Sequence, residues 1–244
     1  RKNSDGPCIA ITHVHLLPFY LLEQIDMKQL IRDTTKNGVI DGDAVIREIF
    51  KSDYEYDVFI SYSHKDSLIA QRLANFLEDE FDLSVFLDCC FWQSADELLK
   101  SIDKTYCLLA DGKSYDYQKR NYSSSHVHAM LSASIFETIQ NSRVCFFLNT
   151  KNSISSIANS INQTNSPWIF EEIVSARCLI ENKHTNRRLF EDSQQTLVID
   201  YSLPLNGTQI LTNDSLKRWL NDYSKSKEGS ALSILSSMKL DITK

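Results

Sequence analysis

From residue 54 onward, short apolar runs alternate with longer amphipathic segments. This alternation predicts βαβ units, in which helices join parallel strands, and therefore an α/β fold. The first run, 58–62, stops abruptly at small hydroxyl and charged residues, as a buried strand does where it opens into a polar loop. Further strands are expected at 83–87, 144–148 and 196–200.

Helices are predicted between and after these strands, because apolar residues recur there three and four positions apart. They are expected at 67–81, 95–104, 129–139, 167–179, 215–223 and 231–240. The first should bury Leu68, Ile69, Leu73, Phe76 and Leu77. The helix at 167 has a clear start, since Ser166 can cap it and Pro167 suits the first helical position. The Ser- and Asn-rich stretch 151–165 predicts a mobile loop.

Residues 1–53 lack the alternating pattern and are predicted to form a small, mostly helical appendage to a main domain at 54–244. Within the appendage we expect a strand and a helix at 8–22, helices at 27–34 and 44–50, and a turn at Asn37-Gly38.

Charge and composition narrow the classes of partner. The net charge of −6 and the pI near 5.5 argue against a nucleic-acid partner, because nucleic-acid-binding surfaces carry a basic patch. The six cysteines form no C-x-x-C pair and several lie in apolar runs, so buried free thiols in a cytoplasmic protein are expected. No apolar run reaches the roughly 18 residues of a membrane span, so no membrane partner is expected.

Several common catalytic motifs are absent from the sequence, including G-x-G-x-x-G, G-x-S-x-G and H-E-x-x-H. The Gly-Lys-Ser at 112–114 resembles the end of a phosphate-binding loop, but Cys107 stands where that loop needs a glycine. His126 and His128 have ligand spacing without an evident third ligand, so no metal is expected. These histidines either line a pocket or face solvent at the start of a helix.

Trp168 and Glu172 are four residues apart and share one face of the capped helix. An aromatic plane beside a carboxylate is typical of a small-molecule site, and open parallel sheets collect ligands at the carboxyl ends of their strands. The alternative is that Trp168 only packs and Glu172 lies on a solvated face.

Two stretches carry a family resemblance. The sequence DVFISYSHKD within 56–66, followed by SPWIFEEI at 166–173, resembles the Toll/interleukin-1 receptor (TIR) domain family, particularly its bacterial members. The resemblance covers roughly residues 54–225 and implies a flavodoxin-like parallel sheet flanked by helices, the TIR fold.

The resemblance also implies an activity. Many TIR domains hydrolyse or cyclise NAD, and the glutamate of their W-x-x-x-E motif is catalytic; here it is Glu172, not Glu171, which lies about 100° around the helix. Cleavage of the nicotinamide–ribose bond develops oxocarbenium character, which a carboxylate stabilises. Trp168 would hold the cationic pyridinium ring.

Further binding residues follow from the resemblance. The first strand and its loop would line the mouth of the site with Phe59, Ser61, Tyr62, Ser63 and His64. His126 and His128 would line the pocket, and Arg120 or Lys119 would meet the pyrophosphate. NAD is the substrate in this interpretation, so no separate cofactor is expected.

The family usually has a short loop after its second strand, whereas a long polar segment with several aromatic residues, 89–125, stands here. Loops longer than about 12–15 residues are usually functional or disordered. We expect this enlarged loop either to mediate assembly, with Trp92 and Tyr115 at the contact, or to form a lid.

The expected function is therefore an NAD glycohydrolase or cyclase that makes an ADP-ribose-type signalling nucleotide. The chain resembles the stand-alone TIR component of Thoeris-type anti-phage systems, which implies bacterial antiviral immunity, a homo-oligomer on activation and a separate effector protein. The alternative is a non-catalytic TIR scaffold that binds other TIR domains. The sequence leaves hydrolysis and cyclisation open.

Overall fold

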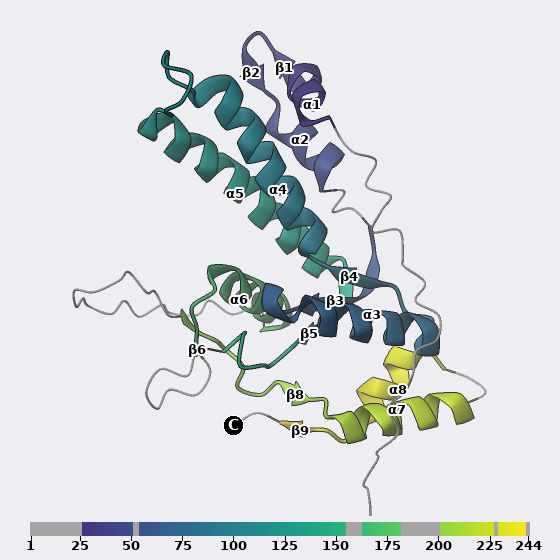
Figure 1. Ribbon diagram of the computed structural model, residues 1–244. Helices are drawn as coiled ribbons and strands as arrows, with labels where there is room; N and C mark the ends of the chain where they lie inside the picture. The colour runs from purple at the N-terminus through teal and green to yellow at the C-terminus, as the bar shows by residue number, and fades with distance from the viewer. Residues whose placement is uncertain (1–25, 51–53, 155–162, 182–200, 227–228, 243–244) are drawn as a thin grey trace, which may run out of the picture.

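The computed structural model describes residues 26–50, 54–154, 163–181, 201–226 and 229–242, and every structural statement here concerns these ranges. At its centre lies a parallel three-stranded sheet in the order β4-β3-β5 (Figure 1). The strands are β3 (Tyr56–Ser61), β4 (Val85–Leu87) and β5 (Ser142–Phe147). The predicted α/β class with a parallel sheet flanked by helices is confirmed, and the order is compatible with a flavodoxin-like arrangement.

Three predicted strands correspond to these three, although β4 is shorter than expected and β5 begins earlier. The fourth predicted strand, 196–200, lies outside the described residues. Besides a small antiparallel pair in the N-terminal region, two further antiparallel pairs complete the strands of the described residues. They are β6 (Gln163–Thr164) with β7 (Tyr201–Ser202), and β8 (Gln209–Ile210) with β9 (Asp241–Ile242).

Successive residues of β3 point to opposite faces of the sheet, and each face packs against its own helices. Val58 and Ile60 enter a core with α3, α7 and α8, in which Trp219 is fully buried. Phe59 enters a second core with α4, α5 and α6. The helix bounds are α3 (Ser67–Phe81), α4 (Cys89–Ile102), α5 (Tyr117–Gln140), α6 (Pro167–Glu181), α7 (Asn213–Lys225) and α8 (Ala231–Ser237).

Helix α3 has the predicted bounds, but its buried face differs from the prediction. Leu68 and Ile69 are 60% and 52% exposed. The buried stripe is Ala70, Ala74, Leu77 and Phe81. These residues follow one another at spacings of three and four, so they form one face, and the small alanines let the helix backbone approach the sheet closely.

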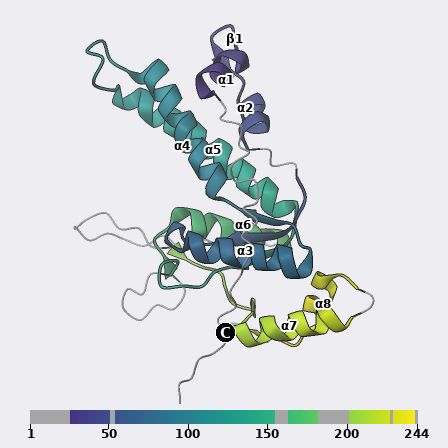
Figure 2. The same cartoon turned by 45° about the vertical axis from the view of Figure 1, so that its right-hand side comes forward.

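The prediction of an enlarged loop at 89–125 is wrong. Helix α4 occupies most of its first half, a π-helical turn η2 (Asp103–Cys107) follows, and α5 begins at Tyr117, well before the predicted 129. Figure 2 shows α4 and α5 as a long hairpin that projects from the sheet. One face of each helix is apolar and packs in the core, with Phe91, Leu98 and Leu131 among its residues. The polar residues that dominate the composition of 89–125 lie on the solvated faces.

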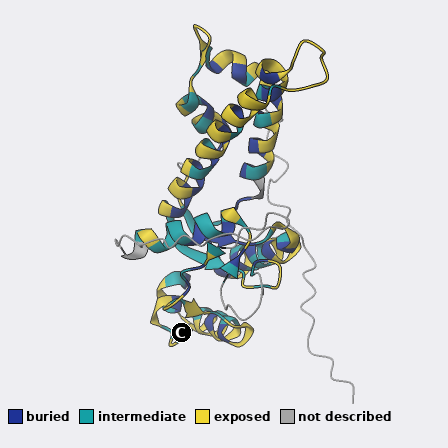
Figure 3. Ribbon diagram, turned by 90° about the vertical axis from the view of Figure 1, so that its left-hand side faces the viewer, coloured by how far each residue is buried: buried dark blue, intermediate teal, exposed yellow. Residues whose placement is uncertain are grey.

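The far end of the hairpin is fastened by a buried carboxylate. Asp103 accepts hydrogen bonds from Arg120 Nε at 2.8 Å and from Ser123 Oγ at 2.6 Å. Beyond this clamp the tip is exposed, as Figure 3 shows.

The described part of the N-terminal region packs against this hairpin (Figure 1). The predicted helices appear as α1 (Met27–Thr34) and α2 (Gly42–Ile49), separated by β1 (Thr35–Lys36) and β2 (Val39–Ile40). The predicted turn is confirmed, with positive φ of 53° at Asn37 and 80° at Gly38. Ile31, Val45 and Phe50 join the same core as Leu98. The strand and helix predicted at 8–22 lie outside the described residues.

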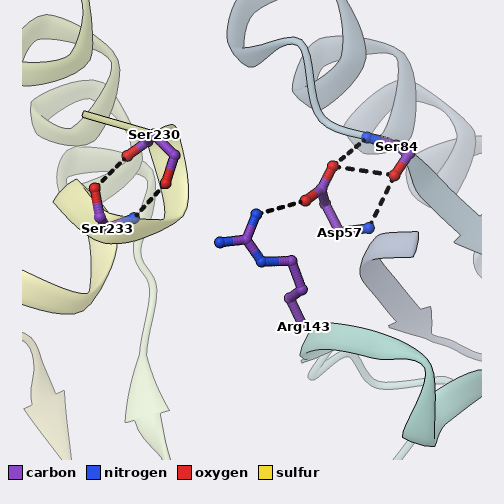
Figure 4. A network of polar contacts seen from close by, with 5 residues as sticks. All are labelled: Asp57, Ser84, Arg143, Ser230 and Ser233. Carbon is purple, nitrogen blue, oxygen red and sulfur yellow. Dashed lines mark hydrogen bonds and ion pairs between the residues drawn. The ribbon is translucent and has the colours of Figure 1, made fainter. Parts of the chain in front are cut away.

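At the amino end of β3, Asp57 joins all three strands (Figure 4). Its carboxylate accepts from the backbone N–H of Ser84, just before β4, at 3.0 Å, and from Arg143 of β5 at 3.0 Å. Burial disfavours ionisation of Asp57, but the hydrogen bonds from Ser84 and Arg143 prevail and hold its pKa below the usual 3.8.

Two remaining expectations concern cysteines and membranes. Cys107, Cys145 and Cys178 are free thiols; Cys107 is buried as expected, whereas Cys178 is exposed. Among the described residues, no helix is both long and apolar enough to cross a membrane.

Candidate functional site

The register of the sheet brings two polar side chains together at its carboxyl edge. Ile60 of β3 pairs with Leu87 of β4, so Ser61 and Asp88, the next residue on each strand, lie side by side. Paired residues of neighbouring strands point to the same face, which here is the face covered by α4, α5 and α6. Both residues are buried, Asp88 with 2% of its surface exposed.

Helix α6 brings a second carboxyl group to the same face. The predicted cap is confirmed, because the Ile169 N–H donates to Ser166 Oγ at 3.3 Å. Ile169 and Ile173 anchor the helix in a small core that includes Phe147 at the end of β5. Trp168 and Glu172 share one face as predicted, but Glu172 is only 1% exposed. The alternative of a solvated glutamate is therefore wrong.

Three polar atoms meet in this buried region without a hydrogen-bond partner among the described residues. They are Ser61 Oγ, Asp88 Oδ1 and Glu172 Oε2. An unsatisfied buried polar group costs about 1–3 kcal/mol, so a cluster of three is poor structural design and indicates a site that serves a ligand or a proton.

The surroundings favour the protonated form of Glu172. Burial raises the pKa of Glu172 well above its ordinary 4.5, and the neighbouring carboxyl of Asp88 raises it further. The Ser61 hydroxyl acts in the opposite direction, and Glu171 adds a smaller rise.

Aromatic rings from four elements gather around the carboxyl groups. Trp92 of α4 donates its indole N–H to Asp88 Oδ2 at 2.6 Å, and its ring lies 4.2 Å from that of Trp168, centroid to centroid. His64, in the 3₁₀ turn η1 (His64–Asp66), lies 5.5 Å from the Trp92 ring, with Nε2 3.9 Å from Asp88 Oδ2. The ring of His128 on α5 is 5.4 Å from Trp168.

We call this arrangement the carboxyl–aromatic site, and define it by Ser61, His64, Asp88, Trp92, Trp168 and Glu172. Sequence reasoning missed Asp88 and placed Trp92 in a contact loop. Asp88 did carry a signal, because it is a polar residue directly after the predicted buried strand 83–87. Trp92 had no such signal, because its position depends on a helix that was not predicted there.

Other predicted site residues lie elsewhere. Phe59 is fully buried and stacks on Phe86 at 5.4 Å, and Tyr62 is buried in the opposite core with α3. Ser63 is half-buried, and its carbonyl accepts from the backbone N–H of Asp66 at 2.7 Å. Phe59 and Tyr62 therefore belong to the core rather than to the mouth of the site, and the Ser63 carbonyl helps to hold the turn after β3.

Two further predicted residues lie on α5 beyond the carboxyl–aromatic site. His126 is exposed and contacts Tyr122, with ring centroids 4.3 Å apart. Arg120 pairs with Asp103, about two helical turns from His128 towards the tip. Of the α5 residues proposed for the pocket, only His128 reaches Trp168.

The loop after β3 is held by a second buried aspartate. Asp66 accepts hydrogen bonds from Thr150 Oγ1 and from Asn152 Nδ2, the latter at 2.7 Å, which ties this loop to the one after β5. The described part of the predicted mobile loop 151–165 is thus fixed at its start. This tie positions His64 at the edge of the carboxyl–aromatic site.

The two carboxyl groups of the carboxyl–aromatic site, Asp88 and Glu172, are almost completely buried in this structure. A surface hollow on α6 is lined by Pro167, Phe170, Glu171, Val174, Ser175 and Tyr201, and it includes neither Trp168 nor Glu172. Access to Glu172 therefore requires movement of the covering rings. Among the described residues, no group of three or more His, Cys, Asp or Glu side chains is placed to hold a metal ion.

Comparison with protein-family models, curated proteins and solved structures found no match to this chain. The fold and the geometry of the carboxyl–aromatic site therefore carry the functional argument.

Proposed function

We propose that this chain is a TIR-type enzyme that cleaves the nicotinamide–ribose bond of NAD. The observation that carries the proposal is the buried Glu172 carboxyl, which has an unsatisfied oxygen and lies beside Trp168 and Trp92 at the carboxyl edge of a parallel sheet. A carboxyl group under aromatic rings suits a ligand that carries a flat cationic ring and develops more positive charge as it reacts.

The chemistry is heterolysis of the bond between C1′ of the ribose and N1 of nicotinamide. The bonding electron pair leaves with nicotinamide, which becomes neutral, so the leaving group needs no general acid. The positive charge passes to the ribose as an oxocarbenium ion, which ionised Glu172 stabilises. In hydrolysis, water adds at C1′ and loses a proton to give ADP-ribose; in cyclisation, a nucleophilic atom of the same nucleotide adds instead.

The covering rings have a role in binding and in access. Trp168 offers its face to the pyridinium ring once Trp92, which now packs edge-on against it, moves aside. Exclusion of water around Glu172 strengthens its interaction with the developing charge. The proposed enzyme therefore opens to admit NAD and closes over it.

The proposed biological role follows from the motif resemblance. The product would be a linear or cyclic signalling nucleotide that acts on a separate effector protein in the bacterial cytoplasm during antiviral defence. Subunits would assemble with one another through the TIR domain on activation.

A non-catalytic scaffold is the second candidate, and one observation favours it. The tip of the α4–α5 hairpin exposes several large side chains, among them Tyr117 and Tyr122. Exposed tyrosines are common at protein contacts. A scaffold, however, gives no reason for the unsatisfied carboxyl oxygens at the other end of the hairpin.

The test is incubation of the purified chain with NAD, with the products resolved by mass spectrometry. Glu172→Gln keeps the side-chain volume but removes the charge, and should lower NAD consumption about 100- to 1,000-fold. Glu171→Gln is the matched control, because Glu171 lines the surface hollow on another face of α6, and it should retain most activity. Equal losses in both variants, or no turnover by the wild type under any assembly condition, would contradict the proposal.

A further inference from the structure

We propose that Asp88 and Glu172 form a proton-sharing pair, in which Asp88 holds the negative charge and Glu172 holds the proton until a cationic substrate enters. Asp88 is then a positioning residue that sets the protonation state of Glu172. The inference about substrate entry rests on the proposed function, whereas the pair itself rests on the geometry of the empty site.

The geometry brings the two groups together from different layers. Asp88 directly follows β4, and Glu172 belongs to α6; the two buried carboxyl groups are close enough to interact by charge and by a side-chain hydrogen bond. Both are almost completely buried. Two ionised carboxylates cannot share such a place, because their repulsion is strong in a region with little water.

One proton resolves both unsatisfied oxygens. Asp88 Oδ1 and Glu172 Oε2 are acceptors without a donor among the described residues. A protonated carboxyl group is a hydrogen-bond donor as well as an acceptor. A proton on Glu172 Oε2 therefore supplies the donor that Asp88 Oδ1 lacks, and leaves neither oxygen unsatisfied.

The environment decides which group carries the charge. The indole N–H of Trp92 donates to Asp88 Oδ2 at 2.6 Å, and His64 Nε2 lies 3.9 Å from the same oxygen. Asp88 also stands at the N-cap of α4, where the helix dipole favours an anion. Glu172 lies inside α6 without these advantages, so the proton belongs on Glu172.

The other titratable groups near Glu172 agree with this assignment. Burial raises the pKa of Cys145 on β5 to about 12, so its thiol stays neutral. Glu171 on α6 adds negative charge, and so also favours a protonated Glu172. His64 from η1 and His128 from α5 approach the rings or Asp88.

The pair gives the site a built-in response to charge. A pyridinium ring above Glu172 stabilises the ionised carboxylate, so the shared proton leaves for solvent when NAD enters. Glu172 then becomes the anion that the oxocarbenium ion requires. Without a cation, the buried site holds one negative charge instead of two.

The test is a carbon-13 NMR titration of the free protein with labelled carboxyl groups, assigned with Glu172→Gln. Asp88→Asn should lower the midpoint at which Glu172 ionises by about one pH unit or more, the threshold at which two groups are coupled. Asp103→Asn is the control, because it neutralises another buried aspartate, at the far end of the hairpin and outside the carboxyl–aromatic site, and it should leave that midpoint unchanged. An unchanged midpoint in Asp88→Asn would overturn the pair.

A second variant keeps the inference testable if Asp88→Asn does not fold. Trp92→Phe removes the donor to Asp88 but keeps an aromatic ring, so the negative charge is held less firmly on Asp88 and the midpoint of Glu172 should fall. An unmoved Glu172 midpoint would overturn the assignment of the charge to Asp88.

The activity readout is the pH dependence of kcat/KM for NAD. Its acidic limb should move to lower pH in Asp88→Asn, which a purely structural role for Asp88 would not cause; an unmoved limb would count against the pair. Absence of NAD turnover in the wild type would reject the proposed function. The NMR midpoints would still show whether Asp88 and Glu172 share a proton.

Discussion

At the scale of single residues, Glu172 is a carboxyl group with a high proton affinity in a buried position, where apolar side chains are usual. Its pKa is raised by burial and by Asp88, so the folded chain keeps a proton that the unfolded chain releases above its ordinary pKa of 4.5. Between these two pKa values the folded state binds more protons, and stability therefore falls as pH rises. The site thus reduces stability at neutral pH.

This cost gives a stability prediction for Glu172→Gln. The neutral amide has no proton to lose, so the variant should melt at a higher temperature than the wild type near neutral pH. The difference should vanish below about pH 4, where both chains carry a neutral side chain in either state. Thermal melts across that range check the prediction. A variant that melts lower than the wild type near neutral pH would assign Glu172 a structural role.

Trp168 gives the second prediction at this scale. Trp168→Ala removes a half-buried ring that contacts Trp92 and His128, and should cost up to about 3–5 kcal/mol of unfolding free energy. Trp168→Phe keeps an aromatic face and should retain most NAD binding, while Trp168→Ala raises KM. Urea unfolding and steady-state kinetics measure the two effects. A stable Phe variant that binds NAD as poorly as Ala would show that stacking on any aromatic face is not enough.

At the scale of elements, the sheet is short, and a polar link at its amino end fixes the strands relative to one another. Asp57 holds the start of β3 to Ser84 and to Arg143. The strand register depends on this link, and the register in turn decides that Ser61 and Asp88 are neighbours at the opposite edge.

Asp57→Asn should therefore destabilise the fold by about 1.5–3 kcal/mol near neutral pH, the range for hydrogen bonds to a charged group. The pKa of Asp57 is lowered in the folded state, so its contribution is present above its ordinary 3.8 and disappears as pH falls through the folded value. The wild-type and variant unfolding energies should converge on acidification. Ser84→Ala, which keeps the backbone donor, should show a smaller loss. A difference that stays constant with pH would show that the Asp57 charge is not involved.

At the scale of the whole molecule, the carboxyl–aromatic site and two strongly exposed tyrosines lie towards opposite ends of one hairpin. Helices α4 and α5 carry Trp92 and His128 near the sheet, and Tyr117 and Tyr122, 78% and 70% exposed, near the tip. Contact between subunits at the tip would act on the same two helices that cover Glu172. This connection supports assembly over a lid as the role of 89–125.

We predict that specific activity rises with protein concentration through this contact. Changing Tyr117 and Tyr122 together to Ser should lower activity at a given concentration by about tenfold, as expected for a loss of about 1.4 kcal/mol in association. Melting temperature should not change, since both side chains are exposed. Changing Leu68 and Ile69, exposed on α3, to Ser is the control. Flat specific activity with a monomer by light scattering at every concentration would refute assembly.

The sequence by itself determined the elements whose signals are local. The first helical turn of α6 and the turn at Asn37-Gly38 were predicted, because capping groups, proline and glycine act within a few residues. The bounds of α3 were predicted from the spacing of its apolar residues. The parallel sheet was predictable from the alternation of apolar and amphipathic segments. The shared face of Trp168 and Glu172 followed from helical geometry alone.

Only the tertiary structure decided which elements pack against each face of the helices and the sheet. Segment 89–125 has a narrow apolar stripe that indicates a helix only once a partner covers it, so its polar average misled the prediction. Asp88 and Glu172 are far apart in the chain, and the register of β3 with β4 and the packing of α6 bring them together. Such contacts depend on how elements are placed in space, which periodicity along the chain does not encode.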